Sequence, residues 1–291
     1  MTNENILKIN WSLGNTCNLD CSYCPADLKD GSTAFPTIEV LRPAFAHLLE
    51  QARAFSLIQI DISSGEPTAC EALKVLMLEN TSPEIKFKLQ SNGQADIDWW
   101  KQVAPKIYAI DLSYHSHTDL DHFINVVNTV KETSEITIRV PHTDDNWIAC
   151  HRAYLLFKEI GFPVSMQMLY KNFTKGNNQY LDYDKGQWDT YYRSIGIDPD
   201  APAQVSNTVE YKRMNNLNNY YGHLCYAGVN QIIVDSFGYV YRGWCKSNGH
   251  MGNIFDSTFR LDPKPRPCPR FQCSNGFDLM APKSEKSWGM A

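Results

Sequence analysis

The chain has 291 residues with 43% apolar, 20% charged and 12% aromatic side chains, which suits one large domain with an appendage or two domains. A formal net charge of -5 and the lack of a Lys/Arg block argue against broad nucleic-acid binding. Because the acidic N-terminus has no signal-peptide pattern and no apolar run approaches the roughly 20 residues of a membrane span, we expect a cytoplasmic protein without membrane contact, whose nine cysteines stay reduced for metal ligation.

The first apolar run, Ile6 to Leu13, predicts a strand, and the polar loop after it holds three cysteines. Cys17, Cys21 and Cys24 lie within eight residues, so they can converge on one metal centre from a single loop. A 4Fe-4S cluster normally takes four thiolates, so three would leave one iron open to a ligand from outside the protein. The alternatives fit less well, because zinc sites usually pair two Cys-x-x-Cys knuckles and disulfide frameworks belong to short secreted chains.

A second motif, Ser64-Gly65-Glu66-Pro67, follows the second strand-like run. With the spacing of the three cysteines, it resembles the radical S-adenosylmethionine (radical SAM) superfamily and its Gly-Gly-Glu-Pro element. The resemblance implies that the three cysteines hold a 4Fe-4S cluster whose open iron binds the amine and carboxylate of S-adenosylmethionine (SAM). It also implies further SAM contacts, from Ser64, Gly65, Glu66 and Pro67 to the amine, from Ser91 and Asn92 along the pocket, from Ser113 to the ribose and from Arg139 to the carboxylate.

Two of these residues have a structural alternative. Glu66 could instead tie the end of the second strand to the cysteine loop. Arg139 lies within a predicted strand, so its guanidinium could form an ion pair at the edge of the core rather than bind a ligand carboxylate.

The first 170 residues alternate two apolar periods, and this alternation predicts the fold class. Helical periodicity covers residues 37–55, a stretch from Thr118 to Val130 with Asp121 completing a variant capping box, and residues 147–160, which end at Gly161. Six strand-helix units predict an α/β fold with a parallel sheet and right-handed crossovers. The resemblance implies the same architecture, a partial (β/α)6 TIM-type barrel, to which we assign residues 1–170. Strand character occurs at residues 6–13, 57–62, 85–89, 107–112, 136–140 and 164–169.

Residues 171–221 are rich in Asn, Tyr and Asp and predict a bridge with one final barrel helix around Gln187 to Ser194. Residues 222–291 form a third part. There, alternating runs at 229–234 and 239–245 flank Asp235-Ser-Phe-Gly238, which predicts a hairpin that brings Cys225 close to Cys245.

Two later cysteines, Cys268 and Cys273, could complete a set of four with Cys225 and Cys245. The set resembles the twitch domain, a shortened relative of the SPASM extension of radical SAM enzymes, and this implies an auxiliary 4Fe-4S cluster in a small C-terminal hairpin-and-loop domain. Four residues separate the last pair where the family more often has two, which leaves open whether both are ligands. A structural zinc is the alternative.

Four further residues are candidates for catalysis or packing. His115 and His142 lie at the ends of the fourth and fifth predicted strands and could act as a substrate base, although a loop histidine is more often structural. Cys70 and Cys150 fall in predicted helices, where buried structural thiols are common. Cys70 lies three residues beyond Pro67, so it could instead return a hydrogen atom to a substrate radical, as in radical SAM epimerases.

The resemblance implies a function. One electron, supplied by a flavodoxin- or ferredoxin-type protein, would cleave SAM to a 5′-deoxyadenosyl radical that abstracts hydrogen from a peptide or small natural product. An auxiliary cluster would then accept an electron, so that the net reaction is an oxidation or an oxidative bond formation. The first strand begins by Ile6, so we expect no leader-binding domain before the barrel. The alternatives are an epimerase and a zinc-binding regulatory protein.

Overall fold

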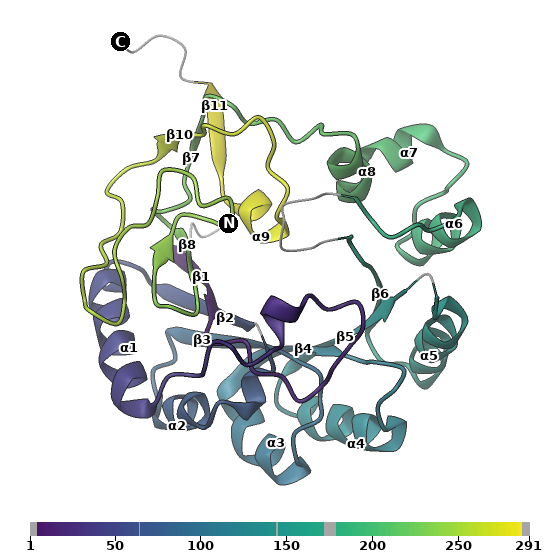
Figure 1. Cartoon of the computed structure of the whole chain (residues 1–291), viewed down its shortest axis with the longest axis horizontal. Helices are drawn as coiled ribbons and strands as arrows, with labels where there is room; N and C mark the ends of the chain where they lie inside the picture. The colour runs from purple at the N-terminus through teal and green to yellow at the C-terminus, as the bar shows by residue number, and fades with distance from the viewer. Residues whose placement is uncertain (1–4, 64, 144, 172–178, 287–291) are drawn as a thin grey trace.

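Six parallel strands form the centre of the computed structural model, which describes residues 5–63, 65–143, 145–171 and 179–286 (Figure 1). Each strand pairs in parallel with the next one along the chain, so the order is β6-β5-β4-β3-β2-β1. The predicted parallel partial barrel is confirmed. The strands are β1 (Ile6–Ser12), β2 (Leu57–Ser63), β3 (Ile85–Ser91), β4 (Ile107–Ser113), β5 (Glu135–His142) and β6 (Val164–Met168).

Five helices follow the first five strands and cover one face of the sheet (Figure 1). Their apolar stripes pack on alternate strand residues, and Leu41, Leu48 and Ile60 are 0% exposed in this core. The helices are α1 (Ile38–Ala52), α2 (Glu71–Glu79), α3 (Ile97–Val103), α4 (Leu120–Val130) and α5 (Trp147–Ile160), with short 3-10 turns η1 (Ala26–Leu28), η2 (Pro67–Ala69) and η3 (Ala104–Lys106).

Helix ends match the sequence at α5 and differ at α4. Gly161 ends α5 with a left-handed φ of 89°, which glycine adopts without a steric penalty. At α4, the prediction that Thr118 caps the helix is wrong. Asp119 caps the helix because its carboxylate accepts hydrogen bonds from the Asp121 and His122 amides, whereas the Thr118 hydroxyl donates to the His115 carbonyl.

Between β6 and β7 the described residues form three helices, where the sequence predicted one. Helix α6 (Lys185–Ser194) starts with a capping box in which Asp184 and Gln187 bond each other's backbone amides. Pro202 opens α7 (Pro202–Asn207), and Thr208 caps α8 (Val209–Met214).

The predicted hairpin is present and joins the central sheet. Strands β8 (Gln231–Val234) and β9 (Val240–Tyr241) are antiparallel, and the turn between them uses Gly238 at a φ of 80°. Strand β8 also pairs in parallel with β1, so the complete order is β6-β5-β4-β3-β2-β1-β8-β9. The sequence did not predict this second pairing.

A separate three-stranded sheet lies beyond the hairpin, beside the short helix α9 (Gly276–Met280), at the top of Figure 1. Its order is β10-β7-β11, from β7 (His223–Cys225), β10 (Arg266–Pro267) and β11 (Lys283–Lys286).

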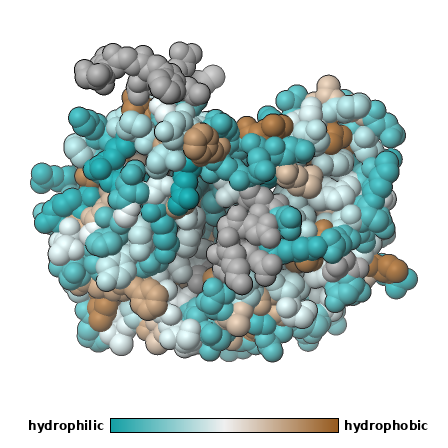
Figure 2. Space-filling model, turned by 45° about the horizontal axis from the view of Figure 1, so that its top comes forward, coloured by the Kyte–Doolittle hydropathy of each residue, from teal (hydrophilic) through white to brown (hydrophobic). Residues whose placement is uncertain are grey.

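The sheet face opposite the helices is polar. Lys88 and Arg139 each place a side-chain nitrogen 3.0 Å from a carboxylate oxygen of buried Asp111. The surface in Figure 2 is largely hydrophilic, with small, separate apolar patches. Of the helices within the described ranges, none combines the length and the apolar character needed to cross a membrane.

Candidate metal and cofactor site

The cysteine loop leaves the carboxyl end of β1 and is held by one buried side chain, Asn15, which is 4% exposed. Its amide nitrogen donates to the Asp27 carbonyl, the Asp30 carboxylate and the Ser32 hydroxyl, and its amide oxygen accepts from the Thr33 amide. Asn15 therefore closes the loop at its base. Sequence reasoning missed it, although an asparagine two residues before Cys17 in a polar turn was a weak signal.

Gly65 brings the second motif against this loop. Its φ is 55°, and a Cβ built on it would stand 2.3 Å from the carbonyl oxygen of Thr16, which is the residue before Cys17. The Glu66 amide donates to the same carbonyl oxygen at 2.8 Å. No side chain fits at Gly65, so glycine is required for the close approach of the two segments. Ser64 lies outside the described residues.

The Glu66 carboxylate is 1% exposed and accepts four hydrogen bonds from the described residues. The donors are the amide and hydroxyl of Thr68, the hydroxyl of Ser91 and the amide of Asn92, at 2.7 to 3.0 Å. Burial raises the Glu66 pKa, and these hydrogen bonds oppose that effect. Glu66 thus ties the end of β2 to the end of β3, which supports the structural alternative for this residue.

Asn92 continues this connection to the cysteine loop. The nitrogen of its side-chain amide donates to the Asn18 side-chain oxygen at 2.7 Å and lies 4.0 Å from the Cys17 sulfur. Pro67 is buried and opens η2 directly after Glu66. The predicted contact residues Gly65, Glu66 and Asn92 are therefore adjacent to Cys17.

The first three cysteines are free thiols that share one loop. Burial raises the pKa of all three, and the Cys24 pKa rises to about 11, because burial and then the neighbouring Cys21 charge disfavour its thiolate. Across the part of the chain that the structure describes, no three His, Cys, Asp or Glu side chains converge to hold one metal ion.

Two histidines and a tyrosine surround the Cys21 sulfur. It lies 3.6 Å from Nδ1 of His115 and 3.9 Å from Nε2 of His117, and the Tyr23 hydroxyl bonds the same His115 nitrogen. Burial lowers the His115 pKa to about 4, so this ring is neutral at pH 7. The structure therefore places the candidate base His115 against the cysteine loop.

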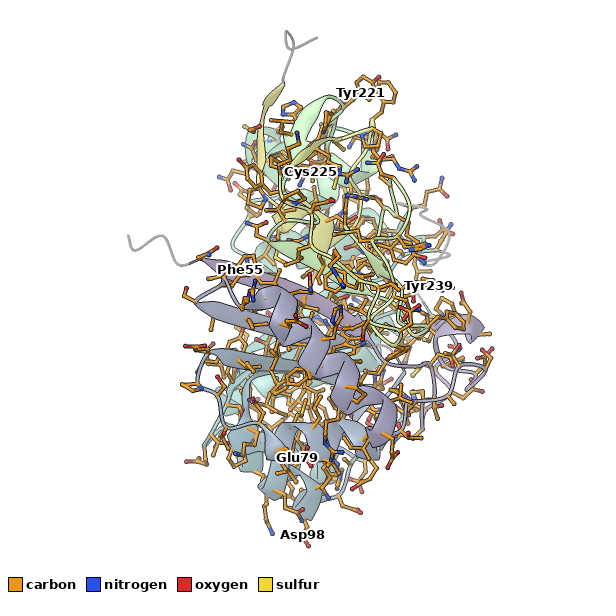
Figure 3. All side chains as sticks on the ribbon, turned by 90° about the vertical axis from the view of Figure 1, so that its left-hand side faces the viewer. Phe55, Glu79, Asp98, Tyr221, Cys225 and Tyr239 are labelled. Atoms are coloured by element: carbon orange, nitrogen blue, oxygen red, sulfur yellow. The ribbon has the colours of Figure 1, made fainter. Side chains whose placement is uncertain are left out.

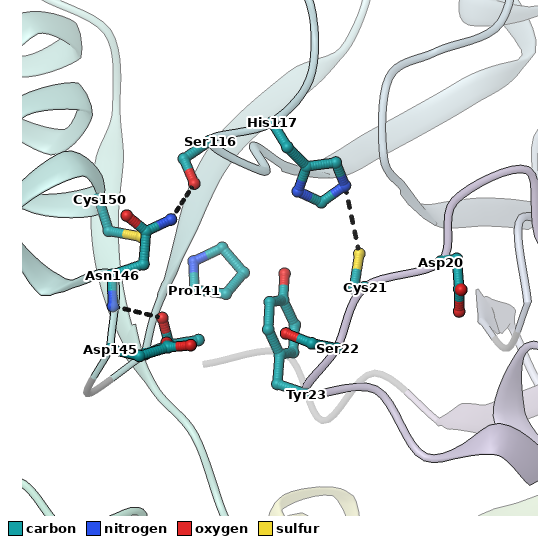
Figure 4. Close-up of a pocket in the computed structure, with 11 residues that line it drawn as sticks. Asp20, Cys21, Ser22, Tyr23, Ser116, His117, Pro141, Asp145, Asn146 and Cys150 are labelled. Atoms are coloured by element: carbon teal, nitrogen blue, oxygen red, sulfur yellow. Dashed lines mark hydrogen bonds between the residues drawn. The ribbon is translucent and has the colours of Figure 1, made fainter.

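A polar pocket of about 230 Å³ opens beside Cys21 (Figure 4). Cys21 and Tyr23 form one wall, and on the other the Asn146 amide donates to the Ser116 hydroxyl at 2.6 Å. Cys150, which the sequence assigned to packing, is 4% exposed and also lines the pocket. The lining residues are Asp20, Cys21, Ser22, Tyr23, Ser116, His117, Pro141, Thr143, Asp145, Asn146 and Cys150.

Four predicted residues lie away from this pocket wall. Arg139 forms the ion pair with Asp111 that was its structural alternative, and half-buried Ser113 is its neighbour in the β4–β5 register. His142 is 0% exposed, contacts the Val140 carbonyl through Nδ1 at 2.8 Å, and has its pKa lowered to about 4 by burial. Cys70 is 1% exposed within the hydrophobic core, which supports packing.

The four C-terminal cysteines come together around β7. Cys225 ends that strand, the Cys268 amide donates to the His223 carbonyl at 2.8 Å, and the Cys273 amide donates to the Asn218 carbonyl at 2.9 Å. Burial raises the pKa of Cys225 and of Cys273, the latter to about 12, and the charges of nearby Cys245 and Cys268 add to both shifts. The predicted set of four is thus spatially close.

Asp278 holds Cys245 in this group, and sequence reasoning missed it. Its two carboxylate oxygens accept from the Trp244 and Cys245 amides, each at 2.8 Å. A Cβ on Gly243 would stand 2.6 Å from the same carboxylate. The Trp244 indole donates to the Asn10 side-chain oxygen of β1 at 2.9 Å, so this turn rests on the barrel. A lone aspartate more than 30 residues from its partner gave no sequence signal.

Comparisons agree with the fold. No protein-family model matches the sequence, and none of the curated proteins matches it. Among solved structures, native anSMEcpe with bound AdoMet is similar over 88% of this chain and 81% of that chain, with a TM-score of 0.56 and 19% identity. SuiB of Streptococcus suis bound to its precursor peptide SuiA is similar over 89% and 66%, with a TM-score of 0.59 and 16% identity. The chain shares the partial (β/α)6-barrel fold of these structures.

Proposed function

We propose that this protein is a radical SAM enzyme that oxidises, or forms a bond oxidatively in, a peptide or a small natural product. One observation carries the proposal: in a radical SAM fold, the loop with Cys17, Cys21 and Cys24 meets Gly65 and Glu66 where β1 and β2 end. Because parallel barrels carry their active sites at this edge, the meeting of the two motifs there supports a cofactor site.

The residues present fit the two groups that this function needs. The three thiols would hold a 4Fe-4S cluster, which supplies, when bound, the single electron for homolytic cleavage of SAM. The hydroxyl and amide groups of Ser116 and Asn146 in the pocket beside Cys21 suit the hydroxyl and ring-nitrogen atoms of a nucleoside. Arg139 is 40% exposed and uses Nη2 for Asp111, so its other N–H groups could bind a carboxylate.

For the C-terminal cysteines we propose an auxiliary 4Fe-4S cluster with four protein ligands, Cys225, Cys245, Cys268 and Cys273. A cluster with four protein ligands has no iron with an open coordination site for substrate, so its role would be to accept an electron. The precursor-peptide complex of SuiB supports a peptide substrate. We propose a flavodoxin- or ferredoxin-type reductant, and three parts of the chain: the barrel (1–170), the bridge (171–221) and the auxiliary part (222–291).

The epimerase alternative needs a thiol beside the substrate. Cys70 was the candidate, and its position in the core does not favour that role. His115 contacts Cys21 and Tyr23 of the cysteine loop and does not line the pocket, which does not favour its role as a substrate base.

Anaerobic reconstitution tests the proposal. We expect iron and sulfide at about eight each per chain, an axial EPR signal after dithionite reduction that changes when SAM is added, and 5′-deoxyadenosine as a product. Cys150→Ala is a matched control for the iron and sulfide content alone, because it removes a thiol that is in neither set but lines the pocket. Zinc as the sole metal, with no SAM cleavage under dithionite, would overturn the proposal in favour of the zinc-binding regulatory class.

A further inference from the structure

Residues 263–271, Pro-Lys-Pro-Arg-Pro-Cys-Pro-Arg-Phe, form a surface segment that we call the proline strap. Its four prolines occupy every second position, and each fixes φ near -65°, so the strap has little conformational freedom to lose on binding. Most of the strap is exposed, including Lys264, Arg266 and Arg270. It is therefore a stiff, solvent-facing element that bears Cys268.

The main chain holds this segment against the C-terminal cysteine group. Arg266 pairs with Cys225 across β10 and β7, and the Cys268 carbonyl accepts from the Gly222 amide at 2.9 Å. Strand β10 is an edge strand, and prolines on an edge offer no N–H to an added strand. A partner at this surface would therefore be recognised by side chains rather than by strand addition.

The strap carries three basic residues and no acidic one, on a chain whose net charge is -5. Asp262, just before it, is already neutralised by buried Arg242 at 2.6 Å and accepts from Arg266 at 2.8 Å. Within the described residues, neither Lys264 nor Arg270 forms an ion pair. This surface therefore has an uncompensated positive charge.

An exposed aromatic pair completes the surface. Phe271 is 67% exposed, and its ring stacks on Tyr221, which is 40% exposed, with centroids 4.4 Å apart and parallel planes. Arg270 is fixed beside it, because its guanidinium donates to the Ser247 hydroxyl and the Cys245 carbonyl. Pre-positioned aromatic and arginine side chains are the residues that most often dominate binding energy at protein interfaces.

We propose that the proline strap and Tyr221 form the docking surface for an acidic one-electron carrier protein, which receives the electron that the auxiliary cluster has taken from substrate. This inference rests on the proposed function, in which each oxidation leaves one electron on that cluster. One electron passes from the reduced cluster to the oxidised carrier, so the cluster is oxidised and the carrier is reduced by one electron and the step balances. The strap supplies Cys268, and Arg270 bonds the Cys245 carbonyl, so a partner seated there lies against the cluster ligands.

The test measures binding of an oxidised acidic flavodoxin to the anaerobic holoprotein by calorimetry at low and at 0.5 M salt. Phe271→Ser should weaken binding by roughly tenfold, and Lys264→Glu by about fivefold at low salt with little effect at high salt. Lys101→Glu is the control, because it makes the same charge change on α3, next to Asp98, at the opposite end of the molecule from Tyr221 (Figure 3).

Stopped-flow oxidation of the reduced holoprotein by the same flavodoxin gives a second readout, which should slow in both strap variants and not in Lys101→Glu. Equal affinities and rates in all three variants would overturn the docking surface. A preference of the strap for an acidic peptide over the flavodoxin would also overturn it in favour of substrate binding. Absence of iron at the C-terminal cysteines, in contrast, would overturn the proposed function itself.

Discussion

Replacing Gly65 with alanine should separate the two motifs of the proposed site. Gly65 has a φ of 55°, and an added Cβ would stand 2.3 Å from the Thr16 carbonyl oxygen. An L-residue other than glycine in the left-handed region costs about 1–2 kcal/mol, and forcing an extra carbon into a packed site typically costs about 1–3 kcal/mol. We therefore expect Gly65→Ala to lower the free energy of unfolding by about 2–5 kcal/mol.

Gly161→Ala is the matched control. Gly161 also has a positive φ, 89°, but nothing lies within 4 Å of the position of its added Cβ. Gly161→Ala should therefore lower the free energy of unfolding only by the conformational cost of the left-handed φ, about 1–2 kcal/mol. Because Thr16 precedes Cys17, relief of the clash at Gly65 should also move the cysteine loop, so Gly65→Ala should retain less iron after reconstitution while Gly161→Ala retains it in full.

The assay is urea unfolding of both variants under anaerobic conditions, before and after reconstitution, with iron quantified per chain. A difference of at least about 1 kcal/mol between the two variants in the apo state would isolate the steric term. Equal destabilisation and equal iron content would refute the reasoning, because the contact between Gly65 and the Thr16 carbonyl would then not constrain the loop.

Three further predictions follow from the site and the core. Alanine at any one of the first three cysteines (Cys17, Cys21 and Cys24) should abolish SAM cleavage, measured as 5′-deoxyadenosine by chromatography. Cys245→Ala should keep uncoupled cleavage but remove the oxidised product, and full product formation in that variant would contradict the auxiliary role. Burial lowers the His142 pKa from 6.5 to about 4, so the stability due to its neutral ring is complete above about pH 6.5 and is lost as the pH falls towards 4. Urea unfolding should show a loss of about 3 kcal/mol over this range from His142, and His142→Asn should flatten the profile; an unchanged profile would remove His142 as the cause.

The central fold could be predicted because the pattern is local. Buried parallel strands read as continuous apolar runs, and the six predicted runs start within a residue of the observed strands. Gly161 was predicted as a helix end for the same reason, since a left-handed residue after an amphipathic stripe is a local signal. Three thiols in one loop are likewise close whatever the rest of the chain does.

The remainder depends on contacts between distant segments. Glu66 binds Ser91 and Asn92, and Asp278 binds the turn at Cys245, but neither partner is marked by spacing in the sequence. The position of Cys150 on a pocket wall depends on where the loop after β5 lies, which periodicity within α5 does not specify. Long-range polar contacts of this kind emerge only when the chain is folded.

The pairing of β8 with β1 has a consequence for how the protein is made. The register pairs Lys8 with Gln231, so one edge of β1 stays unpaired until β8, in the last quarter of the chain, has been synthesised. While the ribosome is still translating the middle of the protein, that edge offers unpaired amide and carbonyl groups beside the loop of Cys17, Cys21 and Cys24. A nascent chain in this state is exposed to intermolecular strand pairing, and we expect chaperone engagement to persist until β8 emerges.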